Sequence, residues 1–185
     1  MYLISLYLDN DADENISRFI KKVASATGNT FMTDNNVPPH ITIAAFEARN
    51  DKIAARVFEK VYANILTRLD VLSNREKDCT DITYVSVGMF LPYVLYITPV
   101  LNEYLHTICA SIYDVISHEE GILPNKYYEP FSYLPHTTIG KKLSEEEMKM
   151  AIDIMRNSFV PFLAKIKRIG LAKPNPHRDI VMYDI

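Results

Sequence analysis

Two short segments of the chain have nearly the same sequence, and each places a histidine and a threonine two positions apart. Residues 39–43 are Pro-His-Ile-Thr-Ile, and residues 135–139 are Pro-His-Thr-Thr-Ile. Residues i and i+2 of a β-strand point to the same face of a sheet. Each segment therefore predicts a strand that presents one imidazole and one hydroxyl side by side.

The pairing of the two segments is more informative than either copy alone. A single histidine and threonine on a half-buried strand is most often structural, since threonine is a common strand residue. Here two of the five histidines occupy the pattern, and each follows a proline. The matched copies favour two half-sites that face one cleft, where a pair of imidazoles is suited to acid–base chemistry.

The composition is that of an ordinary globular protein, with 185 residues, 48% apolar and 23% charged. This length suffices for one sizeable domain or two small lobes that share a core. The net charge of −3 gives no overall attraction to nucleic acid or anionic membrane, so a phosphate-bearing ligand needs a local positive site. The two cysteines form no CxxC or zinc pattern, and we expect a reducing, cytoplasmic location.

The sequence predicts no targeting or membrane-spanning segment. The first eight residues are apolar and no basic residue precedes them, which favours a strand over a signal peptide. The longest apolar stretch, Val85–Val100, is interrupted by one glycine and two prolines, so it does not predict a transmembrane helix. We therefore expect no membrane association.

The first half of the chain predicts strands and helices around the first motif. The expected strands are Tyr2–Leu8, His40–Phe46 and Leu69–Leu72. Apolar residues at helical spacing predict one helix that ends at Gly28 and another that Asn50 caps. The polar segment Asn29–Pro39 is expected to be a loop.

The second half repeats this plan. The expected strands are Ile82–Phe90, Val94–Ile97, Ser132–Gly140, Phe162–Ala172 and Ile180–Tyr183. The dipeptide Thr98-Pro99 predicts a helix start, and Ser144 with Glu147 predicts a capping box for the last helix. Charged or polar loops are expected at Ser73–Asp81 and Gly121–Pro130.

The two halves together predict the fold class. Both run through strand, helix, loop, motif strand and helix, and the motif histidines are 96 residues apart (136 − 40), about half the chain. We expect an α+β fold built as a bilobal, pseudo-two-fold duplicated unit, with antiparallel β-sheets around a central cleft and helices on the outer faces. Residues 1–185 are expected to form a single domain of two lobes with interleaved strands, and a monomer.

Two aromatic residues of the first half are candidates for substrate binding. Tyr7 shares its strand face with Ser5, and this polar face could border the cleft; a core or hydrogen-bonded role is the alternative. Phe46 is in phase with His40 and Thr42 and could stack on a base at the cleft rim. Packing in the core is an equal alternative for Phe46.

Lys142 is a third candidate for substrate binding. It shares the face of His136 and Thr138 if that strand continues past Gly140, and otherwise it is a solvated lysine at the strand end. The histidines at positions 106 and 118 are expected to be structural or exposed. His177 lies in a Pro/Asn turn and could reach a phosphate, although a solvated loop is the favoured interpretation.

The segments His40-Ile41-Thr42-Ile43 and His136-Thr137-Thr138-Ile139 resemble the paired H-x-(T/S)-apolar signature of the two-histidine (2H) phosphoesterase superfamily. The order of elements along most of the chain resembles that of its 2′,5′ RNA ligase-like and cyclic phosphodiesterase branch. The resemblance implies that the two histidines form the acid–base pair and that the two threonines bind phosphate. It also implies that the reaction needs neither a metal nor a cofactor.

The chemistry of these residues agrees with the resemblance. Opening a cyclic phosphodiester needs a base to activate water and an acid to protonate the leaving sugar oxygen. Two imidazoles with ordinary pKa values near 6.5 can share these roles at neutral pH. Each threonine can donate to a non-bridging phosphate oxygen. The residues alone do not decide which histidine is the acid.

The predicted function is therefore metal-independent hydrolysis of a cyclic phosphodiester, at an RNA 2′,3′-cyclic phosphate end or in a small cyclic nucleotide. Two alternatives stay open. The same pair could ligate 2′,5′ RNA ends, or the cleft could belong to a non-catalytic nucleotide- or RNA-binding module. The net charge of −3 argues against an extended surface that binds many phosphates of an RNA chain.

Overall fold

The computed structural model describes residues 1–73, 81–174 and 176–185. The strands are β1 (Tyr2–Leu8), β2 (Ile41–Glu47), β3 (Asp81–Phe90), β4 (Val94–Pro99), β5 (Leu123–Pro124), β6 (Thr137–Lys141), β7 (Phe162–Lys173) and β8 (Arg178–Asp184). The helices are α1 (Asn10–Thr27), α2 (Phe31–Asp34), α3 (Asp51–Ser73), α4 (Glu103–Ser117) and α5 (Glu145–Ser158), and a 3₁₀ turn covers Lys126–Tyr128.

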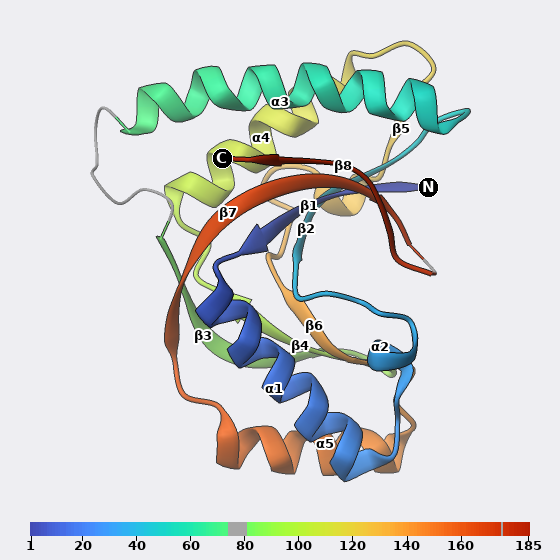
Figure 1. The fold of residues 1–185 in the computed structure, drawn as a ribbon, viewed down its shortest axis with the longest axis vertical. Helices are drawn as coiled ribbons and strands as arrows, with labels where there is room; N and C mark the ends of the chain where they lie inside the picture. Colours follow the sequence, from blue (N-terminus) through green and yellow to red (C-terminus); the bar gives the residue numbers. More distant parts are fainter. Residues whose placement is uncertain (74–80, 175) are drawn as a thin grey trace.

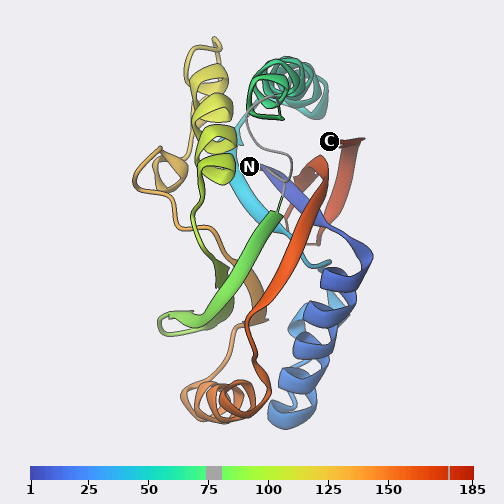
Figure 2. The same cartoon turned by 90° about the vertical axis from the view of Figure 1, so that its left-hand side faces the viewer.

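The described strands form one antiparallel sheet of eight strands. The order is β5-β2-β1-β7-β3-β4-β6, and β8 also pairs with β7. The long strand β7 joins the two halves, because its residues 162–165 pair with β3 and its residues 166–172 pair with β1. Figure 2 shows β7 running from the level of α3 and α4 to the level of α5.

The two halves of the sheet have the same arrangement, and a helix that follows a strand of one half packs against the other half. In one half β1 pairs with the motif strand β2, and in the other β4 pairs with the motif strand β6. Helix α1 follows β1 but packs against α5 and β6, whereas α4 follows β4 but packs against α3 and β2 (Figure 1). This reciprocal exchange confirms the expected duplicated α+β architecture with helices on its outer faces.

The helix ends follow the predicted capping chemistry. The carboxylate of Asp9 accepts from the amide of Ala12 at 2.9 Å, and Gly28 ends α1 in the left-handed conformation with φ 75°. The predicted capping box of Ser144 and Glu147 is present at the start of α5. These caps fix the starts or ends of α1, which packs on β6, and of α5, which packs on α1 and β4.

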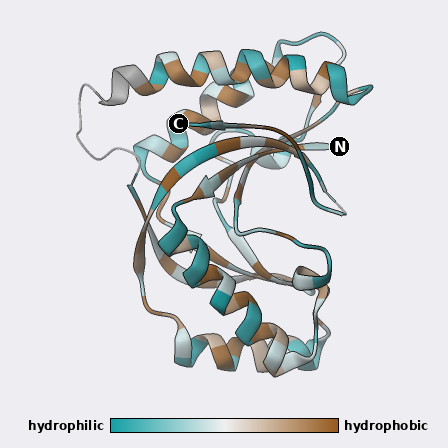
Figure 3. Ribbon diagram, viewed as in Figure 1, coloured by the Kyte–Doolittle hydropathy of each residue, from teal (hydrophilic) through white to brown (hydrophobic). Residues whose placement is uncertain are grey.

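Side chains from both halves of the molecule form the hydrophobic core. Fully buried side chains include Ile4 of β1, Phe58 of α3, Ile97 of β4 and Ile112 of α4. Burying one such side chain contributes about 1.5–3 kcal/mol relative to an exposed one. Figure 3 shows hydrophilic and hydrophobic residues alternating along α1 and α3, as expected for helices with one face against a sheet.

Two element predictions are wrong. Leu69–Leu72 lies in the last turns of α3 rather than in a strand, because the helical pattern continues past Ile65. Thr98-Pro99 ends β4 instead of starting a helix, since the Thr98 hydroxyl donates to the Pro135 carbonyl at 2.6 Å. Helix α4 starts later, where the side chain of Asn102 accepts from a backbone amide.

Other boundaries shift by smaller amounts. The second motif strand is shorter than Ser132–Gly140 and begins at Thr137. The predicted loops Asn29–Pro39 and Gly121–Pro130 contain the short elements α2 and β5. Most of the predicted loop Ser73–Asp81 lies outside the described residues. In the part of the chain that the structure describes, none of the helices has the length and apolar character needed to cross a bilayer.

Candidate active site

The two motifs occupy equivalent places at one cavity. His40 directly precedes β2 and His136 directly precedes β6, so each threonine is the second residue of its strand. All four motif side chains line a cavity of about 220 Å³. Its wall consists of Met1, Leu3, Phe31, Met32, Val37, His40, Thr42, Tyr128, His136, Thr138, Lys141, Pro174 and His177.

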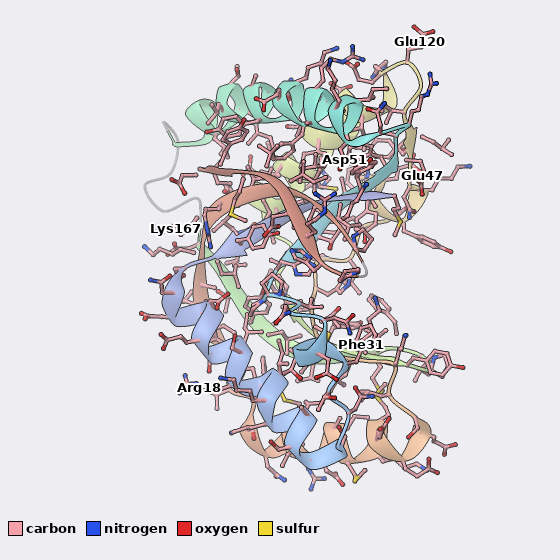
Figure 4. All side chains as sticks on the ribbon, turned by 45° about the vertical axis from the view of Figure 1, so that its right-hand side comes forward. Arg18, Phe31, Glu47, Asp51, Glu120 and Lys167 are labelled. Atoms are coloured by element: carbon pink, nitrogen blue, oxygen red, sulfur yellow. The ribbon has the colours of Figure 1, made fainter. Side chains whose placement is uncertain are left out.

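The cavity draws its wall from both halves of the molecule. Phe31 on α2 lies in the lower half of Figure 4, whereas Glu47 at the end of β2 lies in the upper half. The amino group of Met1, whose side chain lines the cavity, pairs with the Glu47 carboxylate at 2.5 Å. The duplicated fold thus brings two segments 96 residues apart to one site, as the repeat predicts.

Both motif histidines are oriented by the same hydrogen bond. Nδ1 of His40 donates to the carbonyl oxygen of Pro38 at 2.7 Å, and Nδ1 of His136 donates to that of Leu134 at 2.9 Å. A carbonyl oxygen can only accept, so each Nδ1 carries a proton. In the neutral imidazole Nε2 is then the basic nitrogen, and it is the one available for proton transfer.

A tyrosine ring packs beside each motif histidine. The ring centroids are 6.2 Å apart for Tyr7 and His40, and 5.3 Å apart for Tyr96 and His136. Each tyrosine fills space that a side chain on the neighbouring strand would need: a Cβ at Gly170 would lie 2.9 Å from the Tyr7 ring, and a Cβ at Gly88 2.5 Å from the Tyr96 ring. The absence of a side chain at these glycines lets the tyrosines support the histidines.

Burial lowers the pKa of both motif histidines. The pKa of His40 falls to about 4, chiefly through burial, with smaller contributions from the positive charges of His177 and His136. The hydrogen bond to Pro38 and the Asp179 carboxylate oppose this shift. Burial likewise lowers the pKa of His136. Both imidazoles are therefore mainly neutral at pH 7, and an anion bound between them would raise both pKa values.

The motif hydroxyls lie on the same cavity wall. Thr42 hydrogen bonds with the buried hydroxyl of Tyr128, and Thr138 is partly exposed to the cavity. A hydroxyl can rotate to donate to an incoming oxygen. The two threonines can thus place donors on a phosphate bound between the imidazoles.

Phe46 does not reach the cavity, and its predicted role in stacking a base is wrong. The side chain is 1% exposed and stacks in the core on Tyr2, with ring centroids 5.8 Å apart. A β-bulge at Ile43 reverses the alternation of β2 after Thr42, so Phe46 points to the core face. The core-packing alternative is the correct one.

Lys142 also lies outside the cavity wall. Strand β6 ends at Lys141, and Lys142 adopts a left-handed conformation with φ 57°. Its ammonium lies 4.7 Å from the ring centroid of Phe31. A second bulge, at Ile139, gives the cavity-facing position to Lys141 instead. The structure thus places Lys141 in the cavity wall, where strand alternation alone predicts Lys142.

Tyr7 supports the site from behind its wall. The side chain is 3% exposed, and its hydroxyl donates to the Asp179 carboxylate at 2.6 Å. Together with its contact to His40, this makes Tyr7 a hydrogen-bonded packing residue beside the cavity, which was the alternative interpretation.

His177 lines the cavity wall, so the favoured interpretation of this residue as part of a solvated loop is wrong. Its side chain is 7% exposed rather than solvated, and its ring centroid lies 5.5 Å from that of His40. The other two histidines are structural or exposed, as expected: His106 packs on Phe131, and His118 is 79% exposed. The signal available in the sequence was a histidine in a turn between two predicted strands.

A second cavity of about 430 Å³ adjoins the first and shares Tyr128 and His136 with it. Three further aromatic side chains line this cavity: Phe90, Tyr127 and Tyr133. Aromatic faces bind nucleobases by stacking. The site thus extends past His136 into a pocket of aromatic character.

The described ranges 1–73, 81–174 and 176–185 contain no group of three or more His, Cys, Asp or Glu side chains arranged to hold a metal ion.

The sequence model of the 2′-5′ RNA ligase superfamily matches residues 12–178. The chain belongs to this superfamily of two-histidine phosphoesterases. Membership supports an enzyme that acts on phosphodiester bonds, with a phosphoesterase or RNA-processing role. No curated protein matches the chain in sequence.

Among solved structures, the chain is similar to two of Usb1 from Kluyveromyces marxianus, one of them with uridine monophosphate. Each shares 10% sequence identity at a TM-score of 0.41, and the match covers 100% of this chain and 97% of Usb1. Membership of the superfamily rests on the sequence match rather than on these structures.

Proposed function

We propose that this protein hydrolyses a cyclic phosphodiester at an RNA 2′,3′-cyclic phosphate end, by acid–base catalysis between His40 and His136 and without a metal. The observation that carries the proposal is that both histidines and both motif threonines line one cavity. Two imidazoles with free Nε2 atoms supply a base and an acid on the two sides of a bound phosphate.

We assign the base to His40 and the acid to His136. The pKa of His40 is lowered to about 4, so this imidazole is neutral over the wider pH range and is ready to take a proton from water. His136 would then protonate the leaving ribose oxygen from Nε2. In both steps the Nδ1 hydrogen bond to a backbone carbonyl keeps the ring in place.

The remaining polar groups of the wall suit the charge of the reacting phosphate. Thr42 and Thr138 can donate to its non-bridging oxygens, on which negative charge builds up in the transition state. Lys141, three residues after Thr138, supplies a positive charge to a protein whose net charge is −3.

The adjoining aromatic cavity suits the base of the nucleotide that carries the cyclic phosphate. The two cavities meet at His136 and Tyr128, and the aromatic cavity has a volume of about 430 Å³. Stacking of a base on an aromatic side chain contributes about 1–3 kcal/mol. This surface supports a nucleotide substrate over a small phosphodiester without a base.

The test is a panel of uridine 2′,3′-cyclic phosphate, short RNAs with cyclic phosphate ends and linear RNA ends, assayed in EDTA. Wild-type protein should open the cyclic phosphates, whereas His40→Gln and His136→Gln should lose at least 10²-fold in kcat. The exposed His118→Gln is the matched control and should keep wild-type turnover. Dependence on added metal, or wild-type rates in both motif variants, would refute the mechanism.

The same panel separates the two alternatives. Attack of a 5′-hydroxyl end on a 2′,3′-cyclic phosphate end, which breaks the bond from phosphorus to O3′ and forms a 2′,5′-phosphodiester, would favour a ligase. Binding of a 2′-phosphate product without turnover of any cyclic precursor would favour a non-catalytic module. The monomeric state and the cytoplasmic location stay predictions.

A further inference from the structure

The turn between β7 and β8 brings a third histidine to the cavity. His177 lines the wall, and its ring centroid lies 5.5 Å from that of His40. The hairpin is anchored on both sides of this turn, because Asp51 accepts from Lys173 at 2.5 Å and from Arg178 at 2.8 Å. Figure 4 shows Asp51 in the upper half of the molecule. The fold thus holds His177 in place.

One ring nitrogen of His177 is occupied and the other is available. Nε2 lies 3.1 Å from a carboxylate oxygen of Asp179, and the Tyr7 hydroxyl donates to the same oxygen at 2.6 Å. The carboxylate accepts, so Nε2 carries the proton. Nδ1 has no hydrogen-bond partner among the described residues. An imidazole held this way can donate from Nδ1 to an anion when it is doubly protonated.

His177 lines the cavity beside His40. Its ring centroid lies 5.5 Å from that of His40, whereas the ring of His136 packs against Phe90 and Tyr96, with centroids 4.8 Å and 5.3 Å away. His136 also lines the adjoining aromatic cavity, whose described wall does not include His177. His177 therefore belongs to the His40 end of the site, where it can face the group next to a phosphate bound between His40 and His136.

We propose that His177 binds a second phosphate, on the 5′ side of the nucleotide whose cyclic phosphate is opened. This inference rests on the proposed function and deepens it, because it names the substrate class as an RNA end or a 5′-phosphorylated nucleotide. In an RNA chain the 5′ phosphate lies one sugar away from the cyclic phosphate. Apart from the motif histidines, Lys141 and His177 are the side chains of the described wall that can carry positive charge.

The test compares uridine 2′,3′-cyclic phosphate with the same compound carrying a 5′-phosphate. The quantity measured is the ratio of kcat/KM for the phosphorylated over the unphosphorylated substrate. A charge-assisted hydrogen bond should give wild-type protein a ratio of about tenfold. His177→Gln should bring the ratio close to one, mainly through KM for the phosphorylated substrate. His118→Gln is the matched control and should keep the wild-type ratio.

A second variant separates charge from packing. His177→Lys keeps a positive charge in a side chain of different shape, so it should retain more of the ratio than His177→Gln. A ratio of one in wild-type protein, an unchanged ratio in His177→Gln, or equal losses on both substrates would overturn the inference. Each of these results would leave the proposed hydrolysis intact.

Binding tests the same inference without turnover. Calorimetry with uridine 2′-phosphate and uridine 2′,5′-bisphosphate in EDTA should show about tenfold tighter binding of the bisphosphate to wild-type protein. His177→Gln should remove this preference. A protein that binds with this preference but opens no cyclic phosphate would refute the proposed hydrolysis and support the second phosphate site. Equal affinities for the two ligands would overturn the second site.

Discussion

Ile43 and Ile139 occupy the same place in the two motif strands, because each is the extra residue of a β-bulge directly after the motif threonine. Residues 42 and 44 of β2 pair with consecutive residues of β1, which leaves Ile43 without a partner. Residues 138 and 140 of β6 pair in the same way with β4 and leave out Ile139. A bulge redirects the side chains that follow it. The repeat therefore extends from the residue types to the backbone.

The bulge at Ile139 leads to a prediction about two neighbouring lysines. Lys141 lines the cavity, whereas Lys142 lies beside Phe31. Lys141→Met should raise KM for a cyclic phosphate several-fold, because it removes a positive charge from the wall. Lys142→Met makes the same change of charge one residue later, and its KM should stay near the wild-type value. Steady-state kinetics of the two variants at one ionic strength would show this; equal effects would contradict the assigned register.

The two bulges also show how far the sequence could predict the site. The motif residues were predictable because strand alternation holds within the three positions from histidine to threonine. Alternation failed for Phe46 and Lys142, which lie beyond the bulges. An unpaired residue is defined by the partner strand, so nothing in the motif strand itself reveals it.

The position of His177 in the cavity wall could not be predicted from the sequence for a similar reason. Its neighbours His40 and Tyr7 are 137 and 170 positions away (177 − 40 and 177 − 7), and the pairing of β7 with β1 and β8 brings them together. The element order and the duplication were predictable, because hydrophobic periodicity and caps are local signals. The exchange of α1 and α4 between the halves was not, since it depends on tertiary packing.

The pKa values of the motif histidines predict an acidic optimum for kcat/KM. His40 must be neutral to act as base, so the rate should rise with pH through its pKa of about 4. His136 must be protonated to act as acid, so the rate should fall as pH rises through its pKa, which lies below the ordinary 6.5. The bell-shaped pH profile of kcat/KM should therefore have its maximum below pH 6.5.

Measurement of kcat and kcat/KM between about pH 3.5 and 9, a range that brackets the pKa values of the two histidines, would test this optimum. The kcat profile should be displaced to higher pH, because the bound phosphate raises the pKa of both imidazoles. His118→Gln should reproduce the wild-type profiles. A kcat/KM plateau that extends well above neutral pH would contradict the assigned roles.

The same burial of His40 predicts a loss of stability in acid. The pKa of His40 is about 4 in the folded protein and near 6.5 when unfolded, so the unfolded chain binds more protons between these values. The free energy of unfolding should therefore fall as pH drops from about 6.5 to about 4, by at most about 3 kcal/mol. The glutamine of His40→Gln cannot titrate, so the free energy of unfolding of this variant should fall less over this pH range. Urea unfolding of both proteins at several pH values measures the difference, and parallel pH curves would argue against a buried neutral His40.

The glycines behind the two supporting tyrosines give the last prediction. A methyl group at Gly88 would collide with the ring of Tyr96, which packs against His136. Gly88→Ala should therefore lower kcat as well as stability, with overpacking costing about 1–3 kcal/mol. Gly121→Ala is the control, because it introduces strain at φ 76° in a turn where no neighbour lies within 4 Å. Thermal unfolding should show that both variants are less stable than the wild-type protein. At a temperature where both are folded, only Gly88→Ala should have a lower kcat. Equal kcat values would show that the position of Tyr96 does not control His136.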